Sequence, residues 1–151
     1  MERTVLTTGA GTGTGLAAVI EPARRGFHSV GGVRSQSKAR ADVHAAREAG
    51  VKVRTVMLDV IDAQRSERVV NDLEPYGLVN NAGVSASGAI EDVGDDEARL
   101  AFEAVVLGPT RLARPEWRPH RQHDHAAHRL VTGEQARPRG VVVCAPSRAR
   151  G

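Results

Sequence analysis

The sequence has little that would cross-link it or hold it in a membrane. Its 151 residues include one cysteine, Cys144, so an internal disulfide is excluded and a reducing, cytoplasmic setting is expected. No apolar run approaches the roughly 18 residues of a membrane span, and residues 1–4 lack a signal-peptide pattern. Aromatic residues make up only 3%, so Val, Leu and Ala must build the core, which suits a parallel sheet between helices.

Charge is unevenly distributed along the chain. Residues 1–108 hold 12 Lys and Arg against 15 Asp and Glu, whereas residues 109–151 hold 9 Arg against 3 acidic residues. The second part also contains 5 of the 7 prolines and 4 of the 6 histidines. This difference predicts a folded domain over 1–108 and an atypical basic, Arg/Pro/His-rich tail over 109–151. Within the tail, only 140–145 has the pattern of a strand.

Apolar runs and helix signals alternate over the first 108 residues. The expected strands cover residues 3–8, 27–33, 51–58 and 76–79. The expected helices are about 13–25, one from Ser37 to Gly50, one capped by Asp62 and ending at Leu73, and one capped by Asp95 with an apolar face of Ala98, Ala101, Phe102 and Val105. This order predicts an α/β fold: a Rossmann-like, doubly wound parallel sheet with strand order 3-2-1-4. Beyond Gly108 prolines interrupt the pattern, and no further helix is expected.

A glycine-rich turn follows the first strand directly. Residues 8–15 read Thr-Gly-Ala-Gly-Thr-Gly-Thr-Gly and lead into the first helix. Backbone N–H groups and the positive end of a helix dipole favour a phosphate at such a turn. The turn therefore predicts a nucleotide pyrophosphate as the ligand.

Four motifs follow one another along the chain: Thr8-Gly9-x-x-x-Gly13-x-Gly15, Leu58-Asp59-Val60, Asn80-Asn81-Ala82-Gly83, and the helix over 102–108. Over residues 3–108 the chain resembles the short-chain dehydrogenase/reductase family. The resemblance implies hydride transfer between a nicotinamide dinucleotide and a small carbonyl or alcohol whose identity is open. It also implies that two further strands normally follow, so the fold as written is incomplete at its C-terminal side.

The resemblance assigns cofactor-binding roles to matching positions. Gly9, Gly13 and Gly15 would let the turn wrap the pyrophosphate, with Thr12 and Thr14 as nearby donors. Asp59 would hydrogen-bond the adenine amino group, and the backbone of Val60 the ring nitrogen. Three residues after the fourth strand would line the adenosine ribose side and brace that strand: Asn81, Ala82 and Gly83.

The end of the second strand decides between the two nicotinamide cofactors. An acidic side chain there would bind both ribose hydroxyls and repel a 2′-phosphate. This chain has Arg34 and Ser35 instead, and no Asp or Glu occurs between Glu21 and Asp42. A guanidinium suits a phosphate dianion, so NADP(H) is expected over NAD(H). The alternative is that Arg34 is a solvated surface charge.

The catalytic Tyr-Lys pair of the family has no counterpart in this chain. The family's proton relay is a Tyr-x-x-x-Lys pair, but the only tyrosine is Tyr76, followed four residues later by Asn80. Val105 stands where the family has an asparagine, and only Ser147, in a degenerate context, matches the catalytic serine. The sequence thus predicts no catalytic residues and an inactive or weakly active chain. The alternative is a non-catalytic dinucleotide-binding module.

The tail over 109–151 has two explanations. Either the reading frame changes after about residue 108 and partly recovers before 140, or the tail is natural and divergent. Its histidines have no cysteine beside them, so no metal is expected. Its arginines lack interleaved aromatics, so no nucleic-acid partner is expected. The absent strands would leave a sheet edge and apolar helix faces uncovered, which predicts marginal stability and self-association.

Overall fold

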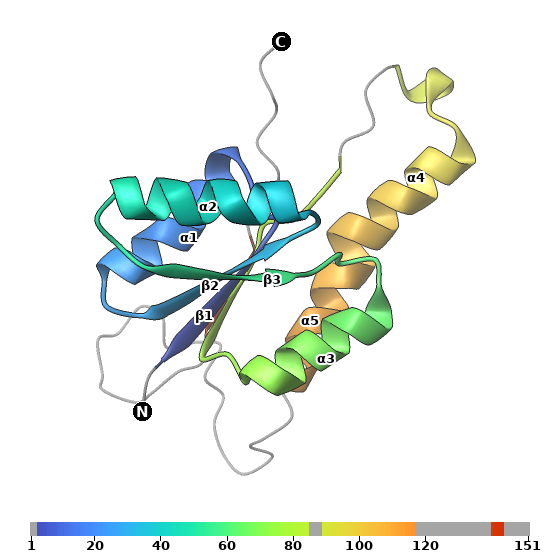
Figure 1. The fold of residues 1–151 in the computed structure, drawn as a ribbon. Helices are drawn as coiled ribbons and strands as arrows, with labels where there is room; N and C mark the ends of the chain where they lie inside the picture. Colours follow the sequence, from blue (N-terminus) through green and yellow to red (C-terminus); the bar gives the residue numbers. More distant parts are fainter. Residues whose placement is uncertain (1–2, 85–88, 117–139, 144–151) are drawn as a thin grey trace, which may run out of the picture.

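The computed structural model describes residues 3–84, 89–116 and 140–143. Its strands form a single parallel sheet in the order β3-β2-β1-β4-β5 (Figure 1). The strands are β1 (Thr4–Thr8), β2 (His28–Val33), β3 (Val53–Met57), β4 (Gly77–Asn80) and β5 (Gly140–Val143). The predicted order 3-2-1-4 is confirmed, and the expected fifth strand pairs with β4 over 140–143.

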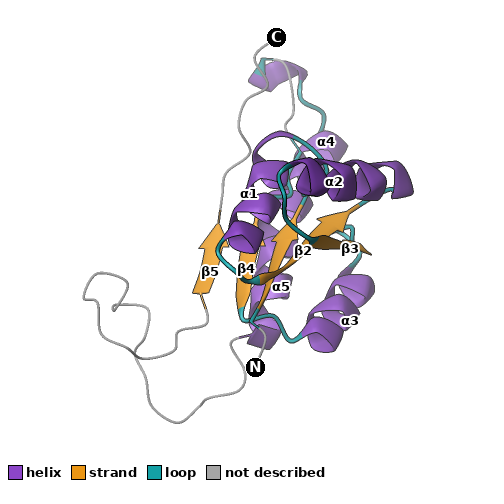
Figure 2. Ribbon diagram, turned by 60° about the vertical axis from the view of Figure 1, so that its left-hand side comes forward, coloured by secondary structure: helices purple, strands orange, loops and turns teal. Residues whose placement is uncertain are grey.

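Helices cover both faces of the sheet, as a doubly wound fold requires (Figures 1 and 2). The helices are α1 (Gly13–Arg24), α2 (Gln36–Glu48), α3 (Ala63–Leu73), α4 (Asp95–Phe102) and α5 (Gly108–Glu116), with a 3-10 turn η1 (Ile90–Asp92) and a π-helical segment η2 (Glu103–Leu107). α1 and α2 lie on one face and α3 and α5 on the other. The predicted Rossmann-like fold class is confirmed.

The core consists of two apolar layers, one on each face of the sheet. Beneath α1 and α2 the buried residues are Ala10, Val19, Val33, Ala39, Ala46 and Val53. Beneath α3 and α5 they are Leu6, Val30, Leu58, Val60, Val70, Leu78, Ala104 and Leu112. Val, Leu and Ala side chains fill these layers, as the scarcity of aromatic residues predicts.

Pro22 lies inside α1, yet the helix continues to Arg24. A proline has no N–H to donate to the carbonyl four residues earlier, here that of Ala18. The hydroxyl of Thr7 donates to that carbonyl at 3.3 Å instead. The β1 side chain thus satisfies the acceptor that Pro22 leaves open and ties α1 to the sheet.

Side-chain caps begin α2 and α3, and two of the expected caps need correction. Asp62 caps α3 as predicted, its carboxylate accepting from the Arg65 N–H at 3.0 Å. α2 is capped by Ser35 rather than Ser37, because β2 ends at Val33 and the helix begins directly after it. α4 has Gly94 at the capping position, so Asp95 is its first helical residue instead.

The expectation that regular structure stops at Gly108 is wrong for residues 109–116. They form α5, which packs beside α3, and Leu112 is 1% exposed within the core. Gly108 permits this approach, because a Cβ there would lie 2.8 Å from the carbonyl oxygen of Val60. The helix passes Pro109 because the π-helical segment just before it accommodates the missing N–H bond. The folded part therefore extends beyond the predicted boundary.

The apolar face expected on the helix from residue 95 is also wrong. Phe102 is 56% exposed and Val105 38% exposed, and the surface also carries Leu100 and Val106. The buried stripe instead runs along smaller residues, Ala104 and Gly108, to Leu112. Small side chains let this helix lie close to the segment after β3, where Gly108 approaches Val60. Packing therefore selects a different face from the one that hydrophobicity alone favours.

Candidate dinucleotide site

The glycine-rich turn between β1 and α1 has a backbone that requires glycine. Gly9 has a φ of +64° and Gly13 a φ of +54°, values that side-chain-bearing residues rarely adopt. A Cβ on Gly15 would collide with the carbonyl oxygen of Gly9, and one on Gly9 would lie 2.8 Å from Cα of Ala82. The turn can therefore bring bare backbone up to a ligand.

Thr8 fastens this turn to the segment after β4. Its Oγ1 accepts from the backbone N–H groups of Asn81 and Ala82, each at 3.0 Å. The same hydroxyl donates to the Val79 carbonyl at 3.5 Å. The sequence analysis includes Thr8 in the glycine-rich motif but assigns it no role, although a hydroxyl-bearing residue at the last position of β1 was a usable signal.

Asn81 holds the other side of the turn. Its side-chain amide donates to the carbonyls of Thr8 and Gly9, at 3.1 and 3.0 Å. These carbonyls are therefore directed toward β4. Helix starts carry N–H groups without intrahelical partners, and Thr12 makes no side-chain cap on α1. The result is a turn suited to an anion, with Asn81 as the residue that positions it.

The ends of β2 and β3 contribute the remaining predicted residues. Arg34 is exposed directly after β2, and the Ser35 hydroxyl accepts from the Lys38 N–H at 3.4 Å. After β3, the carboxylate of Asp59 accepts from the Ile61 N–H at 3.3 Å. Val60 is 5% exposed and belongs to the core. Because all these strands run parallel, their carboxyl ends bring the predicted residues to one edge of the sheet (Figure 2).

Two buried polar side chains also lie in the fold without a hydrogen-bond partner among the described residues, Asp42 on α2 and Asn80 at the end of β4. Asp42 is fully buried, and its Oδ2 would lie 3.2 Å from a Cβ on Gly31. Burial raises the pKa of the Asp42 carboxyl, and the positive charge of Lys38 partly offsets that rise. Sequence reasoning missed Asp42, although it lies three residues after Ala39 on the buried face of α2.

The lone tyrosine lies away from this edge. Tyr76 precedes β4, and its N–H donates to the Thr4 carbonyl at 2.7 Å. Its ring stacks on Phe27 at 6.2 Å between centroids, with the Arg3 guanidinium 5.0 Å from the ring centre. These contacts give Tyr76 a packing role at the amino ends of the strands.

Some of the residues discussed from the sequence lie outside the part of the chain that the structure describes. Ser147, Cys144 and the histidines of the tail lie outside the described residues. The part of the chain that the structure describes contains no group of three or more His, Cys, Asp or Glu suited to a metal ion. Among these same residues, no helix combines the length and apolar character needed to cross a bilayer.

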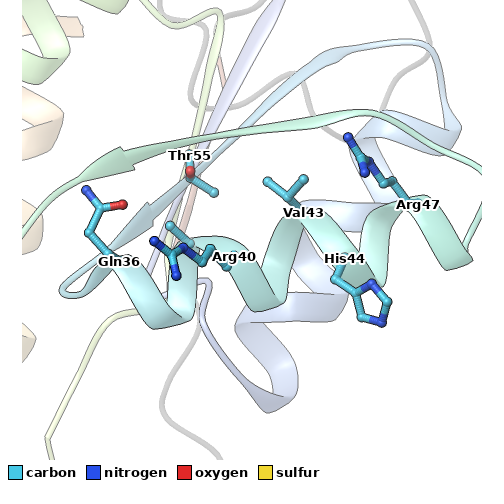
Figure 3. A pocket seen from close by; sticks show the side chains of 7 residues that line it. Gln36, Arg40, Val43, His44, Arg47 and Thr55 are labelled. Carbon is cyan, nitrogen blue, oxygen red and sulfur yellow. The ribbon is translucent and has the colours of Figure 1, made fainter.

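A surface hollow on the flank of the fold lies apart from the glycine-rich turn. It is formed between α2 and the edge strand β3, with Thr55 on the strand side (Figure 3). The α2 residues that line it are Gln36, Ala39, Arg40, Val43, His44 and Arg47. None of them is among the predicted cofactor-binding residues.

The sheet and the glycine-rich turn at its edge thus define a Rossmann-like α/β fold, and comparison with known proteins identifies its family. A sequence model described as short chain dehydrogenase matches residues 3–118. The chain belongs to this family of oxidoreductases.

Individual relatives agree with the family assignment. The uncharacterized oxidoreductase YusZ of Bacillus subtilis is 32% identical over 128 residues, covering 79% of this chain and 45% of YusZ. The short-chain reductase protein NovJ of Streptomyces niveus is 29% identical over 144 residues, covering 92% and 54%. A solved variant of actinorhodin polyketide ketoreductase with NADPH is 26% identical, with a TM-score of 0.71 over 78% of this chain and 47% of that one. The chain spans about half the length of these relatives.

Proposed function

We propose that this chain binds a nicotinamide dinucleotide as the cofactor-binding part of a short-chain oxidoreductase. The observation that carries the proposal is the braced turn, in which Thr8 and Asn81 fix the backbone around Gly9. In this assignment the pyrophosphate lies against the turn and the start of α1, and the adenosine reaches toward Asp59, Val60 and the 81–83 segment. When bound, the cofactor would exchange a hydride with a small carbonyl or alcohol.

NADP(H) is the cofactor that the charges at the end of β2 favour. Arg34 is exposed there, and the first turn of α2 contains no acidic residue. The first acidic residue after β2 is Asp42, whose carboxyl is fully buried. A 2′-phosphate would therefore meet a cation and no carboxylate. Two of the similar solved proteins, the actinorhodin ketoreductase and the Gluconobacter frateurii L-sorbose reductase, are described with NADPH.

Catalysis by these 151 residues alone is proposed to be absent or weak. The sequence contains no Tyr-x-x-x-Lys, and a free phenol with a pKa near 10 relays protons poorly at neutral pH. A non-catalytic dinucleotide-binding module is the second candidate function, and this same absence favours it. If a changed reading frame after about residue 108 explains the tail, translating the other two frames of the gene beyond that codon should reveal a Tyr-x-x-x-Lys.

A titration with NADPH and NADH tests the proposed cofactor. We expect saturable NADPH binding and an affinity for NADH that is at least about tenfold weaker. A tenfold difference corresponds to the free energy of one charge-assisted contact. Arg34→Gln should remove most of that preference. Arg54→Gln, an exposed arginine of β3, is the matched control and should leave it intact. Equal affinities for NADPH and NADH would refute the preference, and no binding of either would refute the function.

Steady NADPH oxidation with a panel of small aldehydes and ketones separates the two candidates. Turnover above the rate without protein supports an oxidoreductase, whereas binding without turnover supports the non-catalytic module. The same site is proposed in both cases, so the titration remains the primary measurement.

Self-association and a cytoplasmic location also remain proposals. Four apolar side chains of the α4–η2 segment are exposed to solvent and support self-association: Leu100, Phe102, Val105 and Val106. The single cysteine supports a reducing compartment.

A further inference from the structure

We infer that Lys38 is a second specificity-determining residue, which acts with Arg34 on the 2′-phosphate of NADP(H). This inference rests on the proposed function and adds a residue to it. Lys38 belongs to the first turn of α2, three residues after the capping Ser35. Its position against the glycine-rich turn is a tertiary contact between segments more than twenty residues apart.

The aliphatic part of Lys38 lies directly over Gly11. A Cβ built on Gly11 would be 2.9 Å from Cβ, 3.0 Å from Cδ and 3.1 Å from Cγ of Lys38. Gly11 therefore has no room for a side chain while Lys38 occupies this place. Lysine stems commonly pack on protein surface while the ammonium stays in water. The packed stem holds the Lys38 charge beside the turn, and the residue as a whole remains exposed.

The charge of Lys38 is available to a ligand at this place. Among the described residues, no carboxylate oxygen lies within ion-pairing distance of its ammonium. Its electrostatic neighbour is Asp42 one helical turn away, which is buried beneath α2. Residues 8–15 contain no cation of their own, so Lys38 supplies the positive charge that the turn lacks.

The position of Lys38 favours the 2′-phosphate over the pyrophosphate. The proposed pyrophosphate site is the start of α1, at Gly13 and Gly15. Gly11 precedes that helix, on the side of the turn that faces α2. Lys38 and Arg34 flank the Ser35 cap, so both charges sit at the α2 end of the site. A phosphate dianion between two cations is bound more tightly than one beside a single cation.

The test compares the affinities of Lys38→Met for NADPH and NADH in the full chain. Methionine keeps an unbranched stem over Gly11 and removes the charge. We expect the Kd for NADPH to rise about tenfold and the Kd for NADH to change less than about twofold. Lys38→Arg restores the charge and should recover most of the NADPH affinity.

Lys52→Met is the matched control. Lys52 is the other lysine of the chain, is exposed, and precedes the amino end of β3, opposite the cofactor edge. Its substitution should alter neither affinity. An unchanged NADPH affinity in Lys38→Met overturns the inference and leaves the proposed function standing. An equal loss of NADPH and NADH overturns the 2′-phosphate assignment, whereas failure of the unmodified chain to bind either cofactor refutes the proposed function itself.

Discussion

Replacing Asp42 with valine should stabilise this protein, although the change removes a charged group from a helix. Asp42 lies on the inner face of α2 between Ala39 and Ala46, with 0% of its surface exposed. Neither carboxylate oxygen has a hydrogen-bond partner among the described residues. A buried acceptor without a partner loses its hydration and gains nothing in return.

The expected gain follows from this desolvation. An unsatisfied buried polar group costs about 1–3 kcal/mol, and more when it is charged. Valine is close to aspartate in shape, so it replaces the oxygens with methyl groups beside Gly31 and Val19. Its extra volume offsets part of the gain. We therefore expect Asp42→Val to raise the free energy of unfolding by about 1–2 kcal/mol near neutral pH, a large share of the 5–15 kcal/mol typical of a domain.

The stability gain of Asp42→Val should depend on pH in a defined direction, whereas a gain from packing alone would be independent of pH. Burial raises the pKa of Asp42 in the folded chain above its unfolded value of about 3.9. Between these two pKa values the folded state holds more protons than the unfolded state, so stability falls as pH rises through this window. Below the unfolded value the carboxyl is neutral in both states and the penalty is smallest. The advantage of Asp42→Val should therefore grow from pH 4 to pH 8.

Urea unfolding of both proteins at pH 4, 6 and 8, followed by circular dichroism, measures this difference. Asp42→Asn is the second variant. It removes the titratable carboxyl, so the difference in unfolding free energy between Asp42→Asn and Asp42→Val should be the same at all three pH values. Asp72→Val, the same change at an exposed position of α3, is the control and should shift stability by less than about 0.5 kcal/mol. If Asp42→Val destabilises the chain equally at every pH, Asp42 has a favourable partner in solution and the reasoning is wrong.

Three further predictions concern the turn and the exposed apolar surface. Thr8→Val leaves two N–H donors without their acceptor and should lower the free energy of unfolding by about 2 kcal/mol or more, measured by urea titration; no loss would show that water replaces the hydroxyl. Gly15→Ala forces a methyl group into the Gly9 carbonyl and should abolish NADPH binding in a fluorescence titration, whereas Gly94→Ala, where a Cβ meets open space, should leave binding unchanged. Phe102→Ser should shift sedimentation toward the monomer, and an unchanged distribution would exclude this surface from self-association.

The sequence by itself determined the features that depend on neighbouring residues. Strand and helix order and the Asp62 cap follow from hydrophobic period and capping chemistry. The end of α2 shortly before Gly50 follows from the φ of +73° that glycine tolerates. The glycine-rich turn was recognisable for the same reason, because its backbone shape is a property of its own residues. The parallel sheet then followed from the alternation of strands and helices, which is typical of a doubly wound fold.

Only the tertiary structure decided which face of a helix is buried and which distant side chains meet. Hydrophobicity favoured Phe102 and Val105 as the inner face, but packing against the core buries Ala104 and Leu112 instead. The same cause buries Asp42, which no local pattern requires to lie inside. Lys38 reaches Gly11 only because β2 pairs with β1 and brings the start of α2 beside the turn. Burial and long-range contacts depend on how the helices and the sheet pack together. Local sequence patterns do not determine that packing for each residue.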